Sequence, residues 1–461
     1  MLTQLSVTNF KSWRSIPEMR LAPITGLFGT NSSGKTSILQ LLLMLKQTAD
    51  SADRGLVLDF GSPKEKSYFN FGTLLDVIYA HERTSKLHWR QEWTVAVEPS
   101  LYLTGYPRMR ELKQAMNEAG SVGISYHATI TAGSQGQAVV ESMGYSMLGY
   151  TVEYLRKKDA PLQYELKYGD AGITPRQGPP GTLPPPVKCF GFPDQVQHSY
   201  SDAGFLSEFP KEFENCLSRV YYLGPLREYP QREYTWSGSQ PLDVGKRGER
   251  VIDAILAARQ RERDASASTG RKGPSLEETI ARWLKELGLI HAFSVEPLAE
   301  NGGLYQVRAQ VSATSAPVLI TDVGFGVSQV LPVLVLCCYV PEGSTILLEQ
   351  PELHLHPSVQ SGLADVFIDA VQNRNVQIVL ESHSEHLLTR LQRRIAEEKL
   401  RASDAALYFC DMPDGASRLT SLQVDAYGNI KNWPDRFFGD DFGEMAAMTR
   451  AAMDRRERGG Q

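Results

Sequence analysis

The stretch GTNSSGKT, residues 29–36, has residue types and a spacing that suit the binding of a phosphate group. Gly29 and Gly34 allow the backbone to curl so that successive amide groups point at an anion, and a helix that starts near Lys35 adds the positive end of its dipole. Lys35 supplies a positive charge to the β and γ phosphates, and the Thr36 hydroxyl is placed to bind Mg2+. The expected nucleotide-binding residues of this loop are Gly29, Asn31, Ser32, Ser33, Gly34, Lys35, Thr36 and Ser37.

The segments around this loop predict the elements that position it. An apolar run from Ile24 to Phe28 precedes it, and a leucine-rich segment from Ile38 to Leu45 follows it. This order predicts strand, glycine loop and helix. A glycine turn without function is the alternative, but the flanking strand and helix favour nucleotide binding.

A second glycine-rich loop lies in TDVGFGVSQVLPVLVLCCYV, residues 321–340. Gly324 and Gly326 precede a helix that we expect to start near Val327 and to be apolar on most faces. Ser328 and Gln329 begin that helix. A glycine-rich loop at a helix N-terminus predicts a second anion site.

An acidic strand end comes next, where an apolar strand from Thr345 to Leu348 leads into EQPELHLHP, residues 349–357. A carboxylate at the end of a parallel strand beside a phosphate loop is suited to holding Mg2+ through water, which predicts this role for Glu349. The neutral amide of Gln350 can orient a water molecule but cannot accept its proton. This pattern predicts slow hydrolysis or a base from elsewhere, for which Glu352 is the nearest candidate.

A further buried strand, expected from Val376 to Leu380, ends at ESHSEH and so places His383 at a strand end. A different chemistry is open for the same region, because histidines and glutamates with this spacing can bind Zn2+ or a pair of metal ions. No CxxC or HExxH motif accompanies them. The candidate ligands for that alternative are His354, His356, His383 and His386, with Glu352 and Glu385 nearby.

Composition indicates a globular protein of about three domains, since the 461 residues are 42% hydrophobic and 22% charged. A net charge of −5 and a pI near 6.1 lack the basic balance that would by itself argue for nucleic acid, although a local patch stays open. Five cysteines without CxxC pairs favour a reducing compartment. We read no signal peptide, and the most apolar run, Val330 to Val340, is too short to span a membrane. A cytoplasmic protein is expected.

The middle of the chain changes texture to β-rich runs between about Leu87 and Lys167, with a helix expected at Met109 to Ala119. The proline-rich stretch Ile173 to Val187 predicts a linker or long loop without regular structure, or a docking site. Helices are expected at Gly248 to Arg263 and at Leu276 to Leu287.

Several arginines are candidates for contacting phosphates. For Arg227, after the strand near Tyr221, a surface salt bridge is favoured over a phosphate contact. For Arg259, Arg261 and Arg263, and for the strip formed by Arg390, Arg393, Arg394 and Arg401, a solvated helix face is favoured over DNA binding.

The motifs NFKSW, GTNSSGKTS, EQPELHLHP and SHSEH together resemble those of the SMC, RecF and ABC-type ATPases. The resemblance implies that Lys11 and Ser12 lie near the nucleotide, that Glu349 is the Walker B residue, and that Gln350 stands where a catalytic glutamate is usual. It also implies that His383 contacts the γ-phosphate as a switch histidine. The signature loop, which binds the γ-phosphate held by a partner subunit, would comprise Gly324, Gly326, Ser328 and Gln329. The glutamine loop of these enzymes has no counterpart near residues 59–82.

The implied fold is α/β, an ABC-type P-loop NTPase head built from both ends of the chain, with a β-rich insertion and a helical arm. We expect the N-terminal half of the head at residues 1–85, the insertion at 86–219, the arm at 220–303, the C-terminal half of the head at 304–410, and a short C-terminal module at 411–461. The chain resembles the ATPase portion of overcoming-lysogenization-defect proteins without their nuclease domain.

Three functions follow as hypotheses. The first, from resemblance to the ATPases of the Septu and PARIS defence systems, is an ATPase that uses ATP and Mg2+ to form a homodimer or higher even oligomer and controls an effector such as a nuclease. The second is a RecF-like repair ATPase that binds DNA. The third, favoured by Gln350, is a nucleotide-gated scaffold that scarcely hydrolyses ATP.

Overall fold

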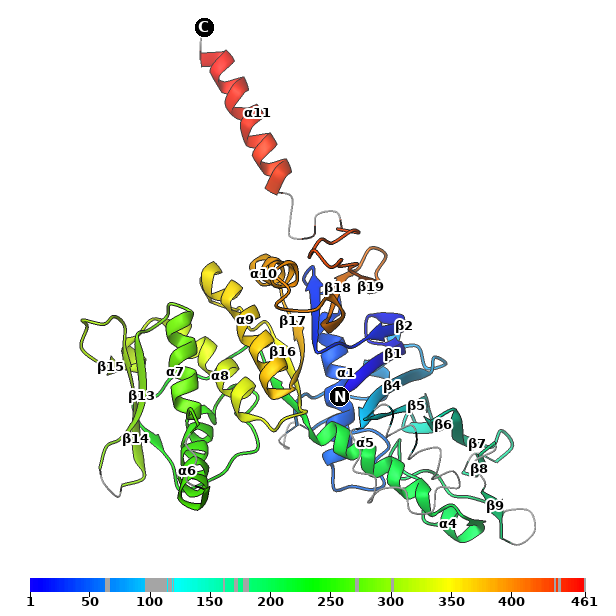
Figure 1. Ribbon diagram of the computed structural model, residues 1–461. Coiled ribbons are helices and arrows are strands. Elements are labelled where there is room, and N and C mark those ends of the chain that lie inside the picture. Colours follow the sequence, from blue (N-terminus) through cyan, green and yellow to red (C-terminus); the bar gives the residue numbers. More distant parts are fainter. Residues whose placement is uncertain are drawn as a thin grey trace.

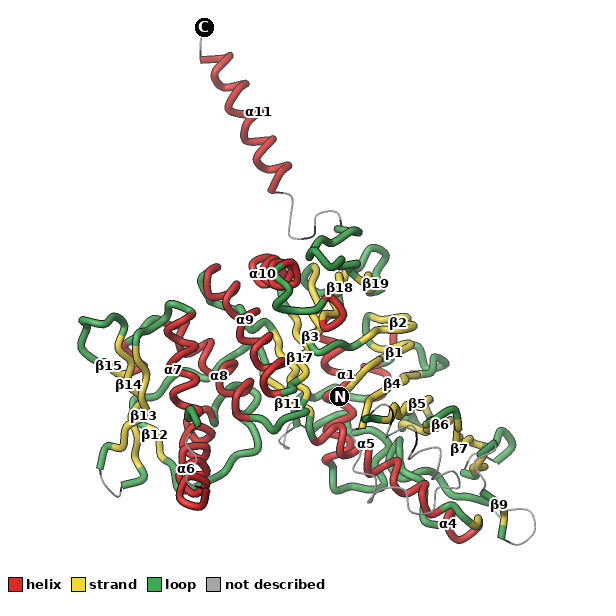
Figure 2. The backbone as a smooth tube through the Cα atoms, in the orientation of Figure 1, coloured by secondary structure: helices red, strands yellow, loops and turns green. Residues whose placement is uncertain are grey.

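The computed structural model describes residues 1–62, 67–95, 120–160, 162–169, 173–176, 182–269, 273–299, 302–434, 437 and 441–459, together with Gln114 and Glu118. The helix expected at Met109 to Ala119 therefore lies outside the described residues, apart from those two positions. Figures 1 and 2 show the arrangement of helices and strands.

A six-stranded, mostly parallel sheet forms the centre of the fold. Its order is β11-β16-β17-β3-β18-β19, and only the edge strand β19 runs antiparallel to its neighbour. The strands are β11 (Val220–Leu223), β16 (Thr345–Glu349), β17 (Gln377–Glu381), β3 (Ile24–Gly29), β18 (Ala405–Asp411) and β19 (Arg418–Ser421). Figure 2 shows the N-terminal strand β3 beside β17. The expected α/β head assembled from both ends of the chain is confirmed.

Helices and a second sheet cover both faces of this parallel sheet, which explains its continuous apolar runs. Along β16, Leu347 packs into the same hydrophobic core as α1 (Lys35–Asp50), whereas Ile346 and Leu348 pack into the other core. This alternation is the two-residue period of a strand. The helices of the second core are α8 (Phe325–Tyr339), α9 (Pro357–Arg374) and α10 (Glu385–Ala396). Helix α8 begins two residues before its expected start.

The β-rich middle of the chain extends a sheet that begins with the two N-terminal strands. This antiparallel sheet has the order β2-β1-β4-β5-β6-β7-β8. Its strands are β1 (Leu2–Phe10), β2 (Trp13–Arg20), β4 (Leu87–Val95), β5 (Val122–Ala132), β6 (Ala138–Met147), β7 (Tyr150–Arg156) and β8 (Tyr164–Lys167).

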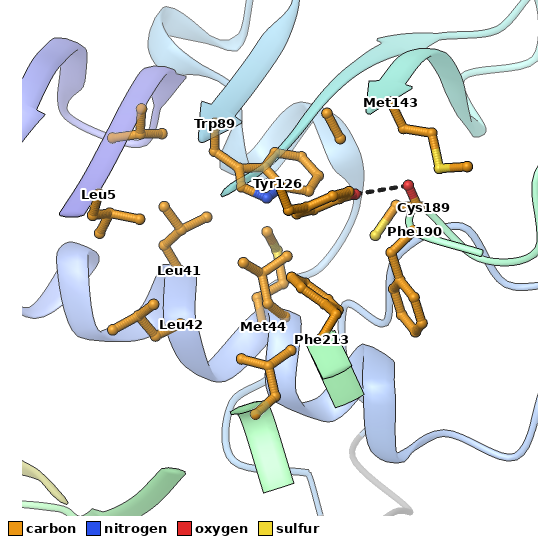
Figure 3. Packing of buried hydrophobic residues seen from close by; sticks show 14 of the residues in the cluster. Leu5, Leu41, Leu42, Met44, Trp89, Tyr126, Met143, Cys189, Phe190 and Phe213 are labelled. Atoms are coloured by element: carbon orange, nitrogen blue, oxygen red, sulfur yellow. Dashed lines mark hydrogen bonds between the residues drawn. The ribbon is translucent and has the colours of Figure 1, made fainter. Parts of the chain in front are cut away.

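Aromatic side chains join this sheet to α1 and to α5 (Glu208–Ser218) (Figure 3). The ring of Tyr126 lies 4.5 Å from the ring of Phe213, and its hydroxyl donates to the Cys189 carbonyl over 2.7 Å. Because these groups are buried together, the insertion and the phosphate-loop helix share one core.

The expected arm contains two helices, α6 (Val251–Thr269) and α7 (Leu276–Glu286), and both pack on α8. A small antiparallel sheet lies next to them. Its strands are β12 (Tyr234–Thr235), β13 (Ala292–Pro297), β14 (Leu304–Gln310) and β15 (Val318–Leu319). The apolar helix α8 is thus enclosed by helices of the arm and the head, which explains its lack of a polar face.

Short elements and the C-terminal helix complete the described chain. They are α2 (Leu74–Val77), α4 (Gln195–Ser199), β9 (Thr174–Pro175), β10 (Tyr200–Ser201), α11 (Asp441–Gly459) and the 3-10 turns Tyr79–His81, Gly204–Ser207, Ile320–Asp322 and Ala402–Asp404. The prediction that residues 173–187 lack regular structure is wrong at β9. This two-residue strand pairs with β10, which supplies backbone partners that a local pattern does not reveal.

Candidate nucleotide-binding site

Two glycines give the phosphate loop its shape. Gly29 has φ 131° and Gly34 has φ 89°, both in the region that favours glycine. A Cβ atom at Gly29 would collide with the Cys410 backbone, and one at Gly34 would lie 2.6 Å from the Ser12 hydroxyl oxygen. The loop is therefore packed against its neighbours so closely that no side chain fits at either position.

Lys35 lies at the centre of this loop. Its side-chain nitrogen donates to the carbonyl oxygens of Gly29 (3.1 Å) and Thr30 (2.6 Å), and the residue is 2% exposed. Burial lowers its pKa. Asn31 and Ser32 are exposed, the Ser33 hydroxyl donates to the Thr30 carbonyl, and the Ser37 backbone nitrogen donates to Gly34. The expected loop residues thus form one cradle around an ammonium group.

The segment NFKSW lies against the loop. The Trp13 indole N–H donates to the Gly34 carbonyl over 2.9 Å, and the ring is fully buried. The Ser12 hydroxyl accepts a hydrogen bond from Ser417. The Lys11 ammonium donates to Gln40 on α1 and lies over the Phe71 ring. These residues support the loop, and Trp13 combines a core position with a hydrogen bond to it.

Thr36 contacts a carboxylate that sequence reasoning did not assign. Its hydroxyl donates to Glu381 over 2.6 Å, and Glu381 is 4% exposed at the end of β17. Glu381 also pairs in register with Glu349 of β16, because the two strands are parallel neighbours. In the sequence, Glu381 is the acidic residue directly before SHSEH. Its contact with Thr36 could not be predicted, because it depends on β17 lying between β16 and β3.

Glu349 is the buried end of β16. It accepts a hydrogen bond from the Tyr222 hydroxyl over 2.9 Å. Burial and then the charge of Glu381 raise the pKa of Glu349 to about 7. The carboxylate predicted to hold Mg2+ is therefore in a setting that disfavours its charged form.

Gln350 and Glu352 connect the ends of β16 and β17. Gln350 has φ 44°, and its backbone N–H donates to the Glu381 carbonyl over 2.9 Å. One oxygen of Glu352 accepts the His383 backbone N–H over 2.6 Å, whereas Oε2 is buried and makes no hydrogen bond among the described residues. Burial raises the pKa of Glu352. Glu352 thus has one oxygen occupied and one able to accept a proton.

His383 lies close to the phosphate loop. Burial and the charge of Lys35 lower its pKa, while a hydrogen bond to the Gly29 backbone opposes this shift. The fold therefore brings the N-terminal glycine loop and the residues Glu349, Glu352 and His383 into one place.

Arg227 does not form the surface salt bridge that was expected, so that prediction is wrong. The residue is 6% exposed, and its Nε and Nη1 atoms make no hydrogen bond among the described residues. It lies after the edge strand β11, which is parallel to β16, so its backbone reaches the same end of the sheet as Glu349. Burial lowers its pKa to about 10, and Tyr222 and Glu349 oppose this shift.

The charges of this region are not paired with one another. Three cationic side chains meet three carboxylates here, yet no ion pair joins the two sets within the described residues. The cations are Lys11, Lys35 and Arg227, and the carboxylates are Glu349, Glu352 and Glu381. Buried charges without partners are costly unless a ligand completes them. The hydrogen-bond donors of the three cations are suited to binding a polyphosphate. The Thr36 hydroxyl and the carboxylates at the strand ends are suited to binding Mg2+.

The second glycine loop lies elsewhere in the chain. Gly324 is exposed, the Ser328 hydroxyl donates to the Phe325 carbonyl, and Gln329 is buried. Figure 1 shows α8 and α1 on opposite sides of β16. No hydrogen bond among the described residues connects Gly324, Gly326, Ser328 or Gln329 with the phosphate loop.

The arginine strip of α10 is largely neutralised. Arg390 and Arg394 pair with Asp365 over 2.7 and 2.5 Å, and Arg393 pairs with Glu397 over 2.6 Å. Arg259 pairs with Glu277. The expectation was a solvated helix face, but the paired side chains of Arg394 and Arg259 are only 15% and 23% exposed.

Two alternatives concern metals and membranes. In the part of the chain that the structure describes, no three His, Cys, Asp or Glu side chains gather closely enough to hold a metal ion, and this includes the histidines near residues 354–386. None of the described helices has the length and apolar character needed to cross a membrane.

Comparison with known families matches two parts of the chain. Residues 198–389 match a family described as an AAA domain, putative AbiEii toxin, type IV TA system. Residues 400–448 match a family described as a protein of unknown function (DUF3696). The search of curated proteins gives no match. The match at 198–389 supports an AAA-type domain that contains Glu349 and His383. The match at 400–448 overlaps the expected C-terminal module at 411–461.

Solved structures similar to this chain include heads of SMC proteins. One is the SmcHead bound to the C-winged helix domain of ScpA (13% identity, TM-score 0.44, 92% of this chain and 98% of that one). Another is the SMC head domain from Thermotoga maritima (11%, 0.39, 92% and 99%). A third is the Smc head domain with an extended coiled coil bound to the C-terminal domain of ScpA derived from Pyrococcus furiosus (9%, 0.43, 92% and 96%). The fold assignment rests on the strand order and the phosphate loop described above.

Proposed function

We propose that this protein is a Mg2+-dependent, ABC-type ATPase that hydrolyses ATP slowly. The observation that supports this proposal most directly is that three cations and three carboxylates lie together without pairing with one another. They lie beside a loop that has room only for glycine at two positions. A polyphosphate with Mg2+ supplies both missing kinds of partner.

Each side chain then has a role. Lys35 and the loop amides bind the phosphates, and Thr36 and Glu349 hold Mg2+, which when bound neutralises charge on the phosphates. Gln350 orients the attacking water. The free oxygen of Glu352 is the acceptor for the proton that the Gln350 amide cannot take. His383 contacts the terminal phosphate.

We further propose that ATP joins two copies of the chain through the loop before α8. Gly324 and Phe325 are exposed there, and the backbone amides at the N-terminus of α8 are suited to binding an anion. In this arrangement Gly324, Gly326, Ser328 and Gln329 contact the nucleotide of the partner. The dimer would act as the sensor and regulatory scaffold of an anti-phage defence system that controls an effector. The description of the family matched at residues 198–389, a putative toxin of a type IV TA system, supports such a setting.

The test of nucleotide binding is isothermal titration of MgATP into wild-type protein and Lys35→Ala. Loss of the loop's central charge is expected to weaken binding at least about 100-fold. Lys285→Ala, at an exposed position on α7, is the matched control and should bind as wild type. Equal binding by Lys35→Ala, with its fold confirmed by circular dichroism, would remove the central assignment.

The dimer is tested with Gly324→Asp and Gly324→Ala. An added Cβ at Gly324 meets no atom within 4 Å, so both variants should fold. The aspartate would face the partner's phosphates and is expected to abolish the ATP-dependent dimer in light scattering, while the alanine variant keeps it. ATP binding to one chain should remain in both. A dimer that persists in Gly324→Asp contradicts this interface.

A further inference from the structure

The segment that carries Arg227 is fixed at both ends. The Gly224 N–H donates to the Lys246 carbonyl over 2.8 Å, and the Glu228 N–H donates to the Arg247 carbonyl over 2.8 Å. These two hydrogen bonds flank Arg227. Its backbone position is therefore set by the fold, and the segment leaves β11 at the end of the sheet where Glu349 lies.

One oxygen of each acid near Arg227 already has another partner. Glu349 accepts from the Tyr222 hydroxyl, and Glu352 accepts from the His383 backbone N–H. Arg227 makes no ion pair with either acid within the described residues, although both influence its charge. The Nε and Nη1 donors thus lie buried without an acceptor. A guanidinium with free donors at a buried position is suited to donating hydrogen bonds to the oxygens of a phosphate group.

The surroundings of Arg227 and Lys35 indicate which phosphate this is. Lys35 is held by carbonyls of the glycine loop, whereas the electrostatic neighbours of Arg227 are Tyr222, Glu349 and Glu352 at the ends of β11 and β16. The two cations therefore approach the site from different elements. In a triphosphate bound by the loop, Lys35 reaches the β and γ phosphates, and the γ-phosphate, as the end of the chain of phosphates, lies toward the acidic strand ends.

We propose that Arg227 binds the γ-phosphate of ATP within its own chain and thereby makes ATP bind more tightly than ADP. This inference rests on the proposed ATP-binding function. Arg227 belongs neither to the phosphate loop nor to the second glycine loop, and it is not the carboxylate proposed to hold Mg2+.

The experiment compares the affinities of ADP and of the non-hydrolysable imido analogue of ATP, both with excess Mg2+, by isothermal titration. The variant Arg227→Met keeps most of the buried side-chain volume and removes the guanidinium. We expect its affinity for the ATP analogue to fall about 10- to 100-fold, with ADP affinity unchanged within about twofold. Arg247→Met, which removes an exposed arginine close to the same segment, should leave both affinities unchanged.

The outcomes separate this inference from the function on which it rests. If wild-type protein binds neither nucleotide, the proposed function fails. Suppose that wild type binds both nucleotides and that Arg227→Met lowers both affinities equally or changes neither. Arg227 then does not distinguish the γ-phosphate, and the inference is overturned. If Arg227→Met does not fold, Arg227→Lys decides. A lysine keeps the positive charge but lacks the several fixed donors of the guanidinium, so the preference for the ATP analogue should fall at least about threefold. An unchanged preference in Arg227→Lys then overturns the inference.

Discussion

Glu349 should release a proton when the Mg2+–nucleotide complex binds. Its pKa of about 7 means that the free protein keeps this carboxyl about 90% protonated at pH 6, about half protonated at pH 7 and about 10% protonated at pH 8. A bound cation requires the carboxylate form. Binding is therefore expected to release about 0.9, 0.5 and 0.1 protons from Glu349 at these three pH values.

The assay is titration calorimetry in pairs of buffers with different ionisation enthalpies, since the dependence of the measured heat on the buffer gives the number of protons released. Mg2+ is kept in excess so that the nucleotide itself is not protonated. Glu349→Gln cannot release this proton, and the wild type minus Glu349→Gln difference removes contributions from other groups such as His383. A difference close to zero at pH 6 and pH 7, with both proteins binding nucleotide, would refute the reasoning.

The same shift has a consequence for stability. A carboxyl whose pKa is raised on folding stabilises the protein below its unfolded pKa of 4.5, and that contribution is lost as pH rises through about 7. The shift corresponds to a loss on the order of 3 kcal/mol between those pH values. Without Mg2+, the melting temperature of Glu349→Gln relative to wild type should therefore rise from pH 5 to pH 8. A pH-independent difference would contradict the buried, protonated state of Glu349.

Two further variants test the hypotheses on catalysis and on DNA binding. Gln350→Glu supplies the missing proton acceptor and should raise turnover at saturating MgATP about 10-fold or more. Because it adds a fourth acid beside Glu381, it should also lower the melting temperature without Mg2+. An unchanged rate would show that Gln350 does not limit hydrolysis. Arg393→Glu combined with Arg394→Glu should leave affinity for duplex DNA unchanged, because Asp365 and Glu397 already pair with these arginines. A salt-sensitive, ATP-stimulated DNA affinity that this double variant loses would instead favour a RecF-like role.

The local elements of the head could be predicted because each carries its own signal. The strand before the phosphate loop and the strand before EQPELHLHP are buried on both faces, so they appear in the sequence as continuous apolar runs. The chemistry-bearing residues stand at the carboxyl ends of these runs. Parallel strands bring such ends to one edge of the sheet, which is why Lys35, Glu349 and His383 meet across more than three hundred residues of sequence.

The neighbours of those residues could not be predicted, because they depend on strand order and on distant backbone. Glu381 meets Thr36 only because β17 lies between β16 and β3. Arg227 carries a charge that usually lies at a surface, and its burial depends on the segment around residues 246–247, some twenty residues further along the chain. In the same way, the sequence of the β-rich middle does not reveal that it extends the sheet begun by β1.

The arrangement of charges implies that ATP and Mg2+ bind as a unit. ATP alone would bring its phosphates toward Lys35 and Arg227 but also toward three buried carboxylates, of which Glu349 and Glu381 are adjacent in register. Mg2+ alone would favour the charged forms of the acids but would leave the donors of Arg227 without an acceptor. Bound Mg2+ should therefore raise the affinity for ATP, and bound ATP should raise the affinity for Mg2+ by the same factor. Thr36 donates to Glu381, and Glu381 pairs in register with Glu349, so the phosphate loop and the acidic strand ends are already connected within the chain.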